Sequence, residues 1–340
     1  MTTGKKSIWI TWESQPRNRS MSQEVGAKLY ELHHGGNRLV RYLVLSGKTI
    51  DLIIRSSVKC VYVQNPSIIL SSIAIVVAKL CRKPVIVDAH NAGVFPLEGR
   101  SRWLNRWCQS LFRGADITIV SNEYLADYVR SHGGRPAVVP DPPLHIAAPT
   151  TLPFNQVAAN AAGNNAAGKK GKWTLLFICT WAADEPYMNV IEAARKLPKD
   201  ILIAITGKYQ NKLTPNQIES LPENVKLLGF LPGDDYHDQL WSADAIMDLT
   251  TRDHCLVCGA YETVAVEKPG IISDLAVNRA YFNKGFVYCD NTVDGIVDAV
   301  ERAKKDDRRL QTEIAQLKKE HGVSWRDYLQ KLLQAVDARY

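Results

Sequence analysis

The sequence predicts an α/β protein made of two doubly wound domains. Short apolar runs alternate with helical patterns twice, once on each side of a segment, residues 146–172, that is rich in Ala, Asn, Gly and Pro. Strand–helix alternation at this spacing indicates a parallel sheet with helices on both faces. The length of 340 residues also suits two domains. We therefore expect residues 146–172 to form a flexible linker between them.

The first domain, residues 1–145, supplies six apolar runs of strand length. Helical patterns separate these runs near residues 20–32, 49–56, 67–80, 101–113 and 123–132. The expected strands are 8–11, 42–45, 60–64, 85–88, 117–121 and 137–139.

The second domain, residues 173–322, repeats the alternation. The expected strands are 175–179, 202–206, 226–228, 245–249, 270–273 and 286–289. The helix after the first of these strands has Pro186 in its first turn, followed by one apolar stripe. The tail, residues 323–340, reads as an amphipathic helix with Trp325 and Leu332 on its apolar face.

Composition limits the class of protein. Hydrophobic residues make up 46% and charged residues 23% of the chain, as in an ordinary soluble globular protein. The longest apolar run, 68–80, is interrupted by serines and is too short to cross a membrane. The N-terminal stretch lacks the features of a signal peptide. We expect a cytoplasmic protein, which could associate peripherally with the inner face of the cytoplasmic membrane.

Neither cysteines nor acidic residues predict a metal site. The seven cysteines are scattered, and an odd number argues against a disulfide framework. Acidic pairs such as 184–185 and 234–235 are adjacent rather than spaced as ligands. The net charge of +7 is compatible with an anionic membrane surface, an anionic substrate or nucleic acid. Nucleic acid is the least favoured partner, because no long basic block or RNA-binding signature occurs.

The stretch 249–274 carries the most informative pattern. An apolar strand leads into a polar turn, and a short helix is expected to start near Gly259 with Glu262 in its first turn. Lys268-Pro269 then ends the helix before another strand. The free N–H groups at a helix N-terminus favour anions. Glu262 either reaches a ribose hydroxyl or caps its own helix.

This stretch resembles the donor-site motif of GT-B glycosyltransferases, especially the retaining family 4 enzymes of bacterial surface polysaccharide synthesis. Glu262 and Lys268-Pro269 match the second half of that motif, whereas His254, with Asp253 beside it, stands where the family has its first glutamate. The resemblance spans nearly the whole chain. It implies two Rossmann-like domains facing a cleft, with the tail helix packed on the first domain. It also implies a nucleotide diphosphate sugar as co-substrate, a glycan or lipid-linked glycan acceptor, and no further cofactor.

The resemblance assigns the donor to the second domain. Glu262 would bind the ribose, Gly259 would open the helix, and Asp253 or His254 would contact the sugar. The leaving diphosphate needs cations and N–H donors if no metal is present. The loop 180–186 carries no basic residue, so Arg252 and Lys208 are predicted to supply the positive charge, although Lys208 could also be a solvated surface residue.

The first domain supplies the residues expected near the reaction centre. The run Asp88-Ala89-His90-Asn91 is similar to the His-Asp pair of family 4, which places His90 near the donor sugar and Asn91 in the position of the aspartate. Strand alternation points Asp88 and His90 the same way. Asp88 could serve as the general base of an inverting enzyme.

Two further stretches are candidates for the acceptor side. Glu13, Arg17 and Arg19 follow the first strand, where the arginines could receive an anionic acceptor or remain surface charges. The helix 101–113 has an apolar stripe and an opposite basic face. That face is either simply solvated or docks, together with Trp103, on anionic lipid headgroups.

Retaining, metal-independent glycosyl transfer is the resulting expectation. A nucleotide-sugar epimerase of the same fold is one alternative, since it needs no acceptor. A non-catalytic sugar-nucleotide-binding scaffold subunit is another, indicated by the acidic loop 180–186 and by His254. An NAD-dependent oxidoreductase is disfavoured because no GxGxxG motif follows the first strand.

Overall fold

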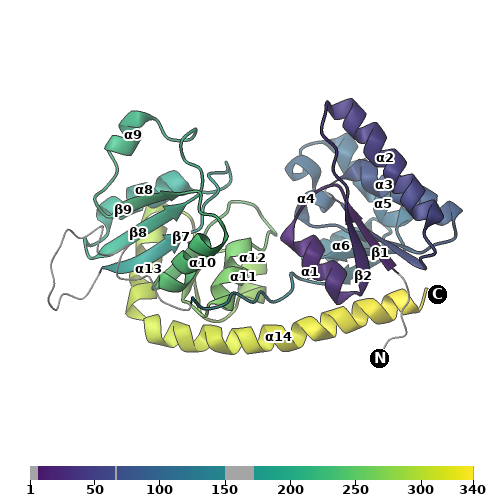
Figure 1. The fold of residues 1–340 in the computed structure, drawn as a ribbon. Coiled ribbons are helices and arrows are strands. Elements are labelled where there is room, and N and C mark those ends of the chain that lie inside the picture. The colour runs from purple at the N-terminus through teal and green to yellow at the C-terminus, as the bar shows by residue number, and fades with distance from the viewer. Residues whose placement is uncertain (1–6, 66, 150–171, 340) are drawn as a thin grey trace. The chain divides into compact units, whose positions relative to one another are not determined.

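The computed structural model describes residues 7–65, 67–149 and 172–339. The chain divides into two compact units, Met1–Pro142 with Val323–Tyr340, and Pro143–Gly322. Each unit contains a six-stranded sheet flanked by helices (Figure 1). Most of the predicted linker, 146–172, lies outside the described residues.

Unit 1 has strands in the order β2-β1-β3-β4-β5-β6, all parallel. The strands are β1 (Ser7–Thr11), β2 (Ala27–Glu31), β3 (Cys60–Gln64), β4 (Val85–Asp88), β5 (Ile117–Val120) and β6 (Pro136–Val138). The helices are α1 (Pro16–Glu24), α2 (Arg38–Arg55), α3 (Ile68–Leu80), α4 (Asn91–Val94), η1 (Pro96–Gly99), α5 (Arg102–Gly114) and α6 (Glu123–Ser131).

Alternation along the strands of unit 1 separates two hydrophobic layers. Ile8 and Val61 face α2, α3, α5 and α6, whereas Trp9 and Tyr62 face α1 and α14 (Asp307–Asp337). The rings of Trp9 and Tyr62 stack with their centroids 5.4 Å apart. Within unit 1, Trp325 of α14 is buried in this second layer, and its Nε1 donates to the carbonyl of Pro140 at 3.2 Å. The amphipathic tail thus completes the core of unit 1.

Two predicted elements of unit 1 were wrong. Residues 42–45 lie inside α2, because Asn37 caps that helix and Leu45, Thr49 and Ile53 bury at helical spacing. The helix expected over 20–32 ends at Glu24, and β2 follows at the edge of the sheet. The residues of β2 are only partly buried, so this strand shows no continuous apolar run.

Unit 2 has strands in the order β12-β11-β10-β7-β8-β9, again all parallel. Its strands are β7 (Trp173–Phe177), β8 (Ile201–Thr206), β9 (Val225–Gly229), β10 (Ala245–Asp248), β11 (Gly270–Ser273) and β12 (Phe286–Cys289). Its helices are α8 (Tyr187–Lys196), α9 (Pro215–Glu219), α10 (Gly233–Ser242), α11 (Cys258–Ala265), α12 (Ala276–Tyr281), α13 (Val293–Lys305) and the first part of α14. Every strand predicted in this half is present, with β7 starting two residues early.

A search of the described helices for an apolar stretch long enough to span a bilayer finds none.

Candidate functional site

Strand order identifies one candidate site in each unit. The order reverses direction between β1 and β3 in unit 1, and between β7 and β10 in unit 2. In open parallel sheets, ligands bind outside the carboxyl ends of the strands at such a switch point. The side chains at these two strand edges are therefore the ones to compare with the sequence predictions.

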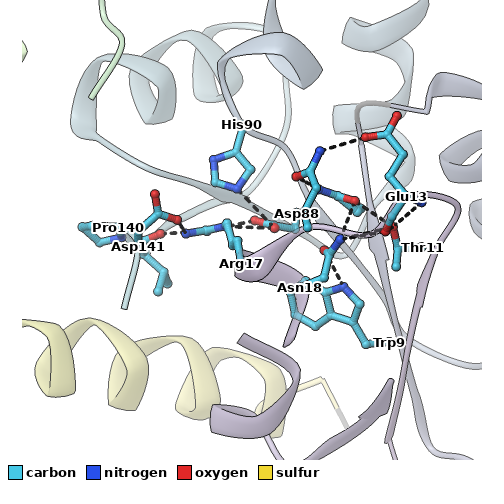
Figure 2. A network of polar contacts seen from close by, with 12 residues as sticks. Trp9, Thr11, Glu13, Arg17, Asn18, Asp88, His90, Pro140 and Asp141 are labelled. Carbon is cyan, nitrogen blue, oxygen red and sulfur yellow. Dashed lines mark hydrogen bonds and ion pairs between the residues drawn. The ribbon is translucent and has the colours of Figure 1, made fainter. Parts of the chain in front are cut away.

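An amide network closes the switch point of unit 1. Gln64, at the end of β3, accepts hydrogen bonds from Thr11 Oγ1 at 2.8 Å and from Asn18 Nδ2 at 2.7 Å. Asn18 in turn accepts from Trp9 Nε1 at 3.1 Å (Figure 2). These side chains are buried. The network fixes the loop that carries Glu13, whose side chain remains exposed at the surface.

Arg17 forms a buried ion pair beside this network (Figure 2). Its Nε and Nη2 donate to the two carboxylate oxygens of Asp88 at 3.1 and 3.0 Å. Its Nη1 donates to Asp141 at 2.6 Å, and Nη2 also reaches the carbonyl of Val139 at 3.0 Å. Burial opposes ionisation of Asp88, but the charge and hydrogen bonds of Arg17, together with the nearby His90, hold its pKa well below its usual range. Arg17 therefore joins α1, β4 and the segment that leaves β6.

This ion pair corrects two predictions. Arg17 does not fit the predicted role of receiving an anionic acceptor, because its side chain is only 8% exposed and its guanidinium is already shared by two carboxylates. Asp88 does not fit the role of general base, because its oxygens are occupied and its pKa is depressed. Arg17 and Asp88 instead connect α1 with β4 and with the segment that leaves β6.

His90 and Asn91 lie next to Asp88. His90 Nε2 is 3.4 Å from Asp88 Oδ2, within ion-pair range but without the geometry of a hydrogen bond. The His90 side chain is 24% exposed at the carboxyl edge of β4, although its Nε2 atom, which faces Asp88, is buried. Asn91 begins α4, and its buried Oδ1 accepts no hydrogen bond from any part of the chain that the structure describes. Arg19 points elsewhere and pairs with Glu31 at 3.2 Å.

In unit 2 the loop after β7 is held by its own glutamate. The Glu185 carboxylate accepts from the backbone N–H of Thr180 at 2.9 Å, from Thr180 Oγ1 at 2.8 Å and from the N–H of Ala182 at 2.9 Å. Trp181, between them, adopts a left-handed conformation with φ of 62° and is fully buried. Glu185 thus occupies N–H groups that would otherwise point at a ligand.

Asp184 joins the loops after β7 and β10 across the switch point. It accepts from Thr250 Oγ1 at 2.8 Å, and its other oxygen lies 3.1 Å from Arg252 Nη2. Arg252 is nevertheless 46% exposed. Arg252, the cation predicted to face the diphosphate, is therefore held at the switch point by its acidic neighbour Asp184.

Asp248, a residue not predicted from the sequence, ends β10, and its side chain contacts the first turn of α11. Its Oδ2 accepts from the N–H of Gly259 at 2.8 Å, and a Cβ on Gly259 would lie 2.5 Å from that oxygen. Burial, with the nearby charges of Glu185 and Glu262, raises the pKa of Asp248 to about 8. The sequence alone could have indicated Asp248, because it is the polar residue that ends an apolar strand.

Glu262 differs from expectation in its position and its partner. Helix α11 begins at Cys258, so Glu262 lies beyond the first turn and does not cap the helix. Its carboxylate accepts instead from the hydroxyl of Tyr236 at 2.5 Å. Burial raises the pKa of Glu262, and the Tyr236 hydrogen bond opposes that shift.

The remaining predicted donor residues are spread along the same edge of unit 2. Lys208 follows β8, and its Nζ lies 5.1 Å from the ring centre of Phe230. Asp253 is exposed, and His254 adopts a positive φ of 61° that is uncommon outside glycine. A cavity of about 710 Å³, lined in part by Trp241 and Lys268, lies instead near the amino ends of the strands. Across the ranges given above, no three His, Cys, Asp or Glu side chains group as metal ligands.

Comparisons with known proteins complete this description. No family model and no curated protein matches the chain. HepE from Anabaena, in complex with UDP and glucose, aligns with a TM-score of 0.74 and 13% identity over 98% of this chain and 100% of its own. A glycosyltransferase from Rickettsia africae aligns with a TM-score of 0.71 and 10% identity, over 99% of each chain. UDP-GlcNAc 2-epimerase from Neisseria meningitidis gives 0.60 and 10%, over 97% of this chain and 100% of its own.

The chain has the GT-B fold. The prediction of an α/β protein with two doubly wound, Rossmann-like domains is therefore confirmed. At these identities the likeness concerns the fold alone, and the roles of individual residues rest on the geometry of this chain.

Proposed function

We propose that this protein is a glycosyltransferase that moves a sugar from a nucleotide diphosphate sugar to a glycan acceptor. The observation that carries the proposal is the set of polar side chains at the switch point of unit 2, where the charge of Glu262 acts on Asp248 and Arg252 pairs with Asp184. Proteins of the same fold support it, since HepE was solved in complex with UDP-glucose and with UDP.

In this proposal the donor lies against the carboxyl edge of unit 2. Glu262 binds the ribose, and Asp253 or His254 contacts the sugar. Arg252 and Lys208 face the diphosphate, because cations placed where charge develops stabilise a leaving group without a metal. Protonation of Asp248 lessens the negative charge of the site, since its pKa is raised to about 8.

His90 acts from unit 1, with Glu13, Arg19 and Asn91 on the acceptor side. Inversion needs a base within reach of the acceptor hydroxyl. The low pKa of Asp88 and its two hydrogen bonds from Arg17 argue against that role. We therefore propose retention, with the leaving phosphate assisting the incoming hydroxyl. A lipid-linked glycan of surface polysaccharide synthesis is the proposed acceptor.

Calorimetric titration with UDP, GDP and their common sugar derivatives tests the donor site. Wild-type protein should bind one nucleotide, and Glu262→Ala should bind it at least tenfold more weakly, because a hydrogen bond to a charged group contributes about 1.5–3 kcal/mol. Tyr236→Phe is the matched control, since it removes the internal partner of Glu262 and leaves the carboxylate. An unchanged Kd in the Glu262 variant would refute its contact with the ribose.

A nucleotide-sugar epimerase is the second candidate, because UDP-GlcNAc 2-epimerases share the fold. Incubation of the bound donor without acceptor separates the two, since an epimerase isomerises the donor alone. A transferase releases nucleotide in proportion to acceptor. Binding without either reaction would favour a scaffold subunit.

A further inference from the structure

Helix α2 exposes a continuous apolar stripe. Leu39 is 70% exposed, Leu43 66% and Ile54 57%, and Ile50 lies between them on the same side of the helix. These positions recur at helical spacing and lie beside the buried positions Leu45, Thr49 and Ile53. A row of exposed large aliphatic side chains indicates a surface that binds something.

The neighbouring helices extend this stripe. Helices α2, α3 and α5 pack side by side on one face of the unit 1 sheet (Figure 1). Val76 and Leu80 of α3 are 58% and 80% exposed. Trp103 of α5 is 66% exposed and lies edge-on against Trp107, whose Nε1 donates to Ser72 of α3 at 2.9 Å. The apolar side chains therefore belong to one helical layer.

The same layer concentrates the positive charge of the chain. Residues 38–113 contain twelve Lys and Arg against three Asp and Glu, a net charge of +9. The whole chain carries only +7, so the rest is slightly acidic. Arg41, Lys48 and Arg106 are exposed cations on the same helices as the apolar side chains.

We propose that the outer surface of α2, α3 and α5 docks the protein on an anionic lipid bilayer. Leucine, isoleucine and tryptophan side chains enter the boundary between headgroups and acyl chains, where an amphipathic helix face binds. The exposed lysines and arginines of the same helices meet the negative headgroups, and each is worth about a fivefold change in affinity. Apolar insertion distinguishes this surface from a nucleic-acid site, which needs cations but not exposed leucines. The docking site serves the lipid-linked acceptor of the proposed function but does not depend on it.

Cosedimentation of the full chain with vesicles tests this inference. We expect binding to equimolar phosphatidylcholine and phosphatidylglycerol, weaker binding at high salt, and little binding to phosphatidylcholine alone. Leu39→Gln/Leu43→Gln/Ile54→Gln should lower the partition coefficient at least tenfold, since even one buried leucine contributes about that factor. Arg41→Gln/Lys48→Gln/Arg106→Gln should lower it and remove most of its salt dependence.

The matched control is Val323→Gln/Met188→Gln. Val323 is 62% exposed on α14, which packs on the other face of the unit 1 sheet, and Met188 is 44% exposed in unit 2. This variant should bind vesicles as the wild type does. No vesicle binding by the wild type, or equal losses in the control and the α2 variant, would overturn the inference. Binding to duplex nucleic acid instead of vesicles, or self-association through α2, would also overturn it.

Nucleotide titration on the same variants keeps the two proposals separate. The α2 variant should retain the wild-type Kd for its nucleotide, because α2 lies in unit 1 and the donor residues lie in unit 2. Vesicle binding without nucleotide binding would leave the docking surface standing and remove the proposed transferase. Nucleotide binding without vesicle binding would leave the proposed transferase standing and remove the docking surface.

Discussion

Replacing Arg17 with methionine tests whether a buried ion pair holds unit 1 together. Arg17 is 8% exposed and Asp88 1%, and two guanidinium nitrogens donate to the two carboxylate oxygens. Methionine keeps the apolar part of the side chain but leaves the Asp88 carboxylate buried without that partner. Removing one member of a buried pair costs about 3–5 kcal/mol. This cost corresponds to roughly two to four orders of magnitude in the equilibrium for opening.

Hydrogen exchange followed by mass spectrometry measures this opening locally. Peptides from β1, α1 and β4 should exchange faster in Arg17→Met by about the factor given above, if they open with unit 1. Arg17→Met/Asp88→Asn should recover most of the loss, because no unpaired charge is then buried. Exchange within about threefold of wild type in the single variant, or no recovery in the double variant, would refute the assignment.

The pH dependence of stability gives a second, independent test of the Arg17–Asp88 ion pair. In the wild type the folded pKa of Asp88 lies below its unfolded value of about 3.9. Its contribution to stability is therefore complete above about pH 4 and is lost as the pH falls toward the folded pKa. In Arg17→Met, the Asp88 carboxyl is buried without the cation, and its pKa is raised. Protonation of Asp88 as the pH falls then removes the unpaired buried charge that destabilises the variant. The stability difference between wild type and variant should shrink as the pH falls from neutral toward about 4.

Three further changes have defined outcomes. The pKa of Asp248 is raised to about 8, so the wild-type protein should lose stability as the pH rises from about 4 to about 8. Asp248→Asn should remove this pH dependence of the melting temperature. A pH dependence retained in the variant would contradict the raised pKa. Gly93→Ala places a Cβ 1.7 Å from the Asn65 carbonyl oxygen, so it should cost on the order of 1–3 kcal/mol in chemical unfolding; unaltered unfolding would show that the loop adapts. Trp325→Ala should cost about 3–5 kcal/mol and speed exchange in the last turns of α14; exchange equal to wild type would mean that Trp325 does not anchor the helix.

The positions of the candidate sites could be predicted from the sequence. Strands buried on both faces read as apolar runs, so the first polar residue after each run falls at the carboxyl edge of the sheet. Asp88, at the end of β4, and His90 just after it were found in this way, whereas Arg252 was chosen because the loop 180–186 carries no basic residue. The same rule points to Asp248, the last residue of β10, which was not predicted as a site residue.

The partners of these residues could not be predicted. Arg17 and Asp88 are 71 residues apart, and only the packing of α1 on the sheet brings them together. Likewise, the pairing of Glu262 with Tyr236 depends on how α10 lies beside α11. Element type was lost where burial was partial, as in the edge strand β2, or where both sides of a helix are apolar, as in α2. Leu43, an exposed leucine inside the run wrongly predicted as a strand, is one of the residues now proposed to enter a bilayer.

The charges at the two switch points differ in a way that bears on catalysis. In unit 1, Arg17 neutralises Asp88 and leaves the partly exposed side chain of His90 at the edge. In unit 2, Glu185 already fills the N–H groups of the loop after β7, and Asp184 already holds Arg252. A diphosphate that bound those N–H groups would have to displace the Glu185 carboxylate. The proposed donor therefore gains least from the backbone and most from Arg252, Lys208 and the protonated form of Asp248, which makes its affinity sensitive to pH near neutrality.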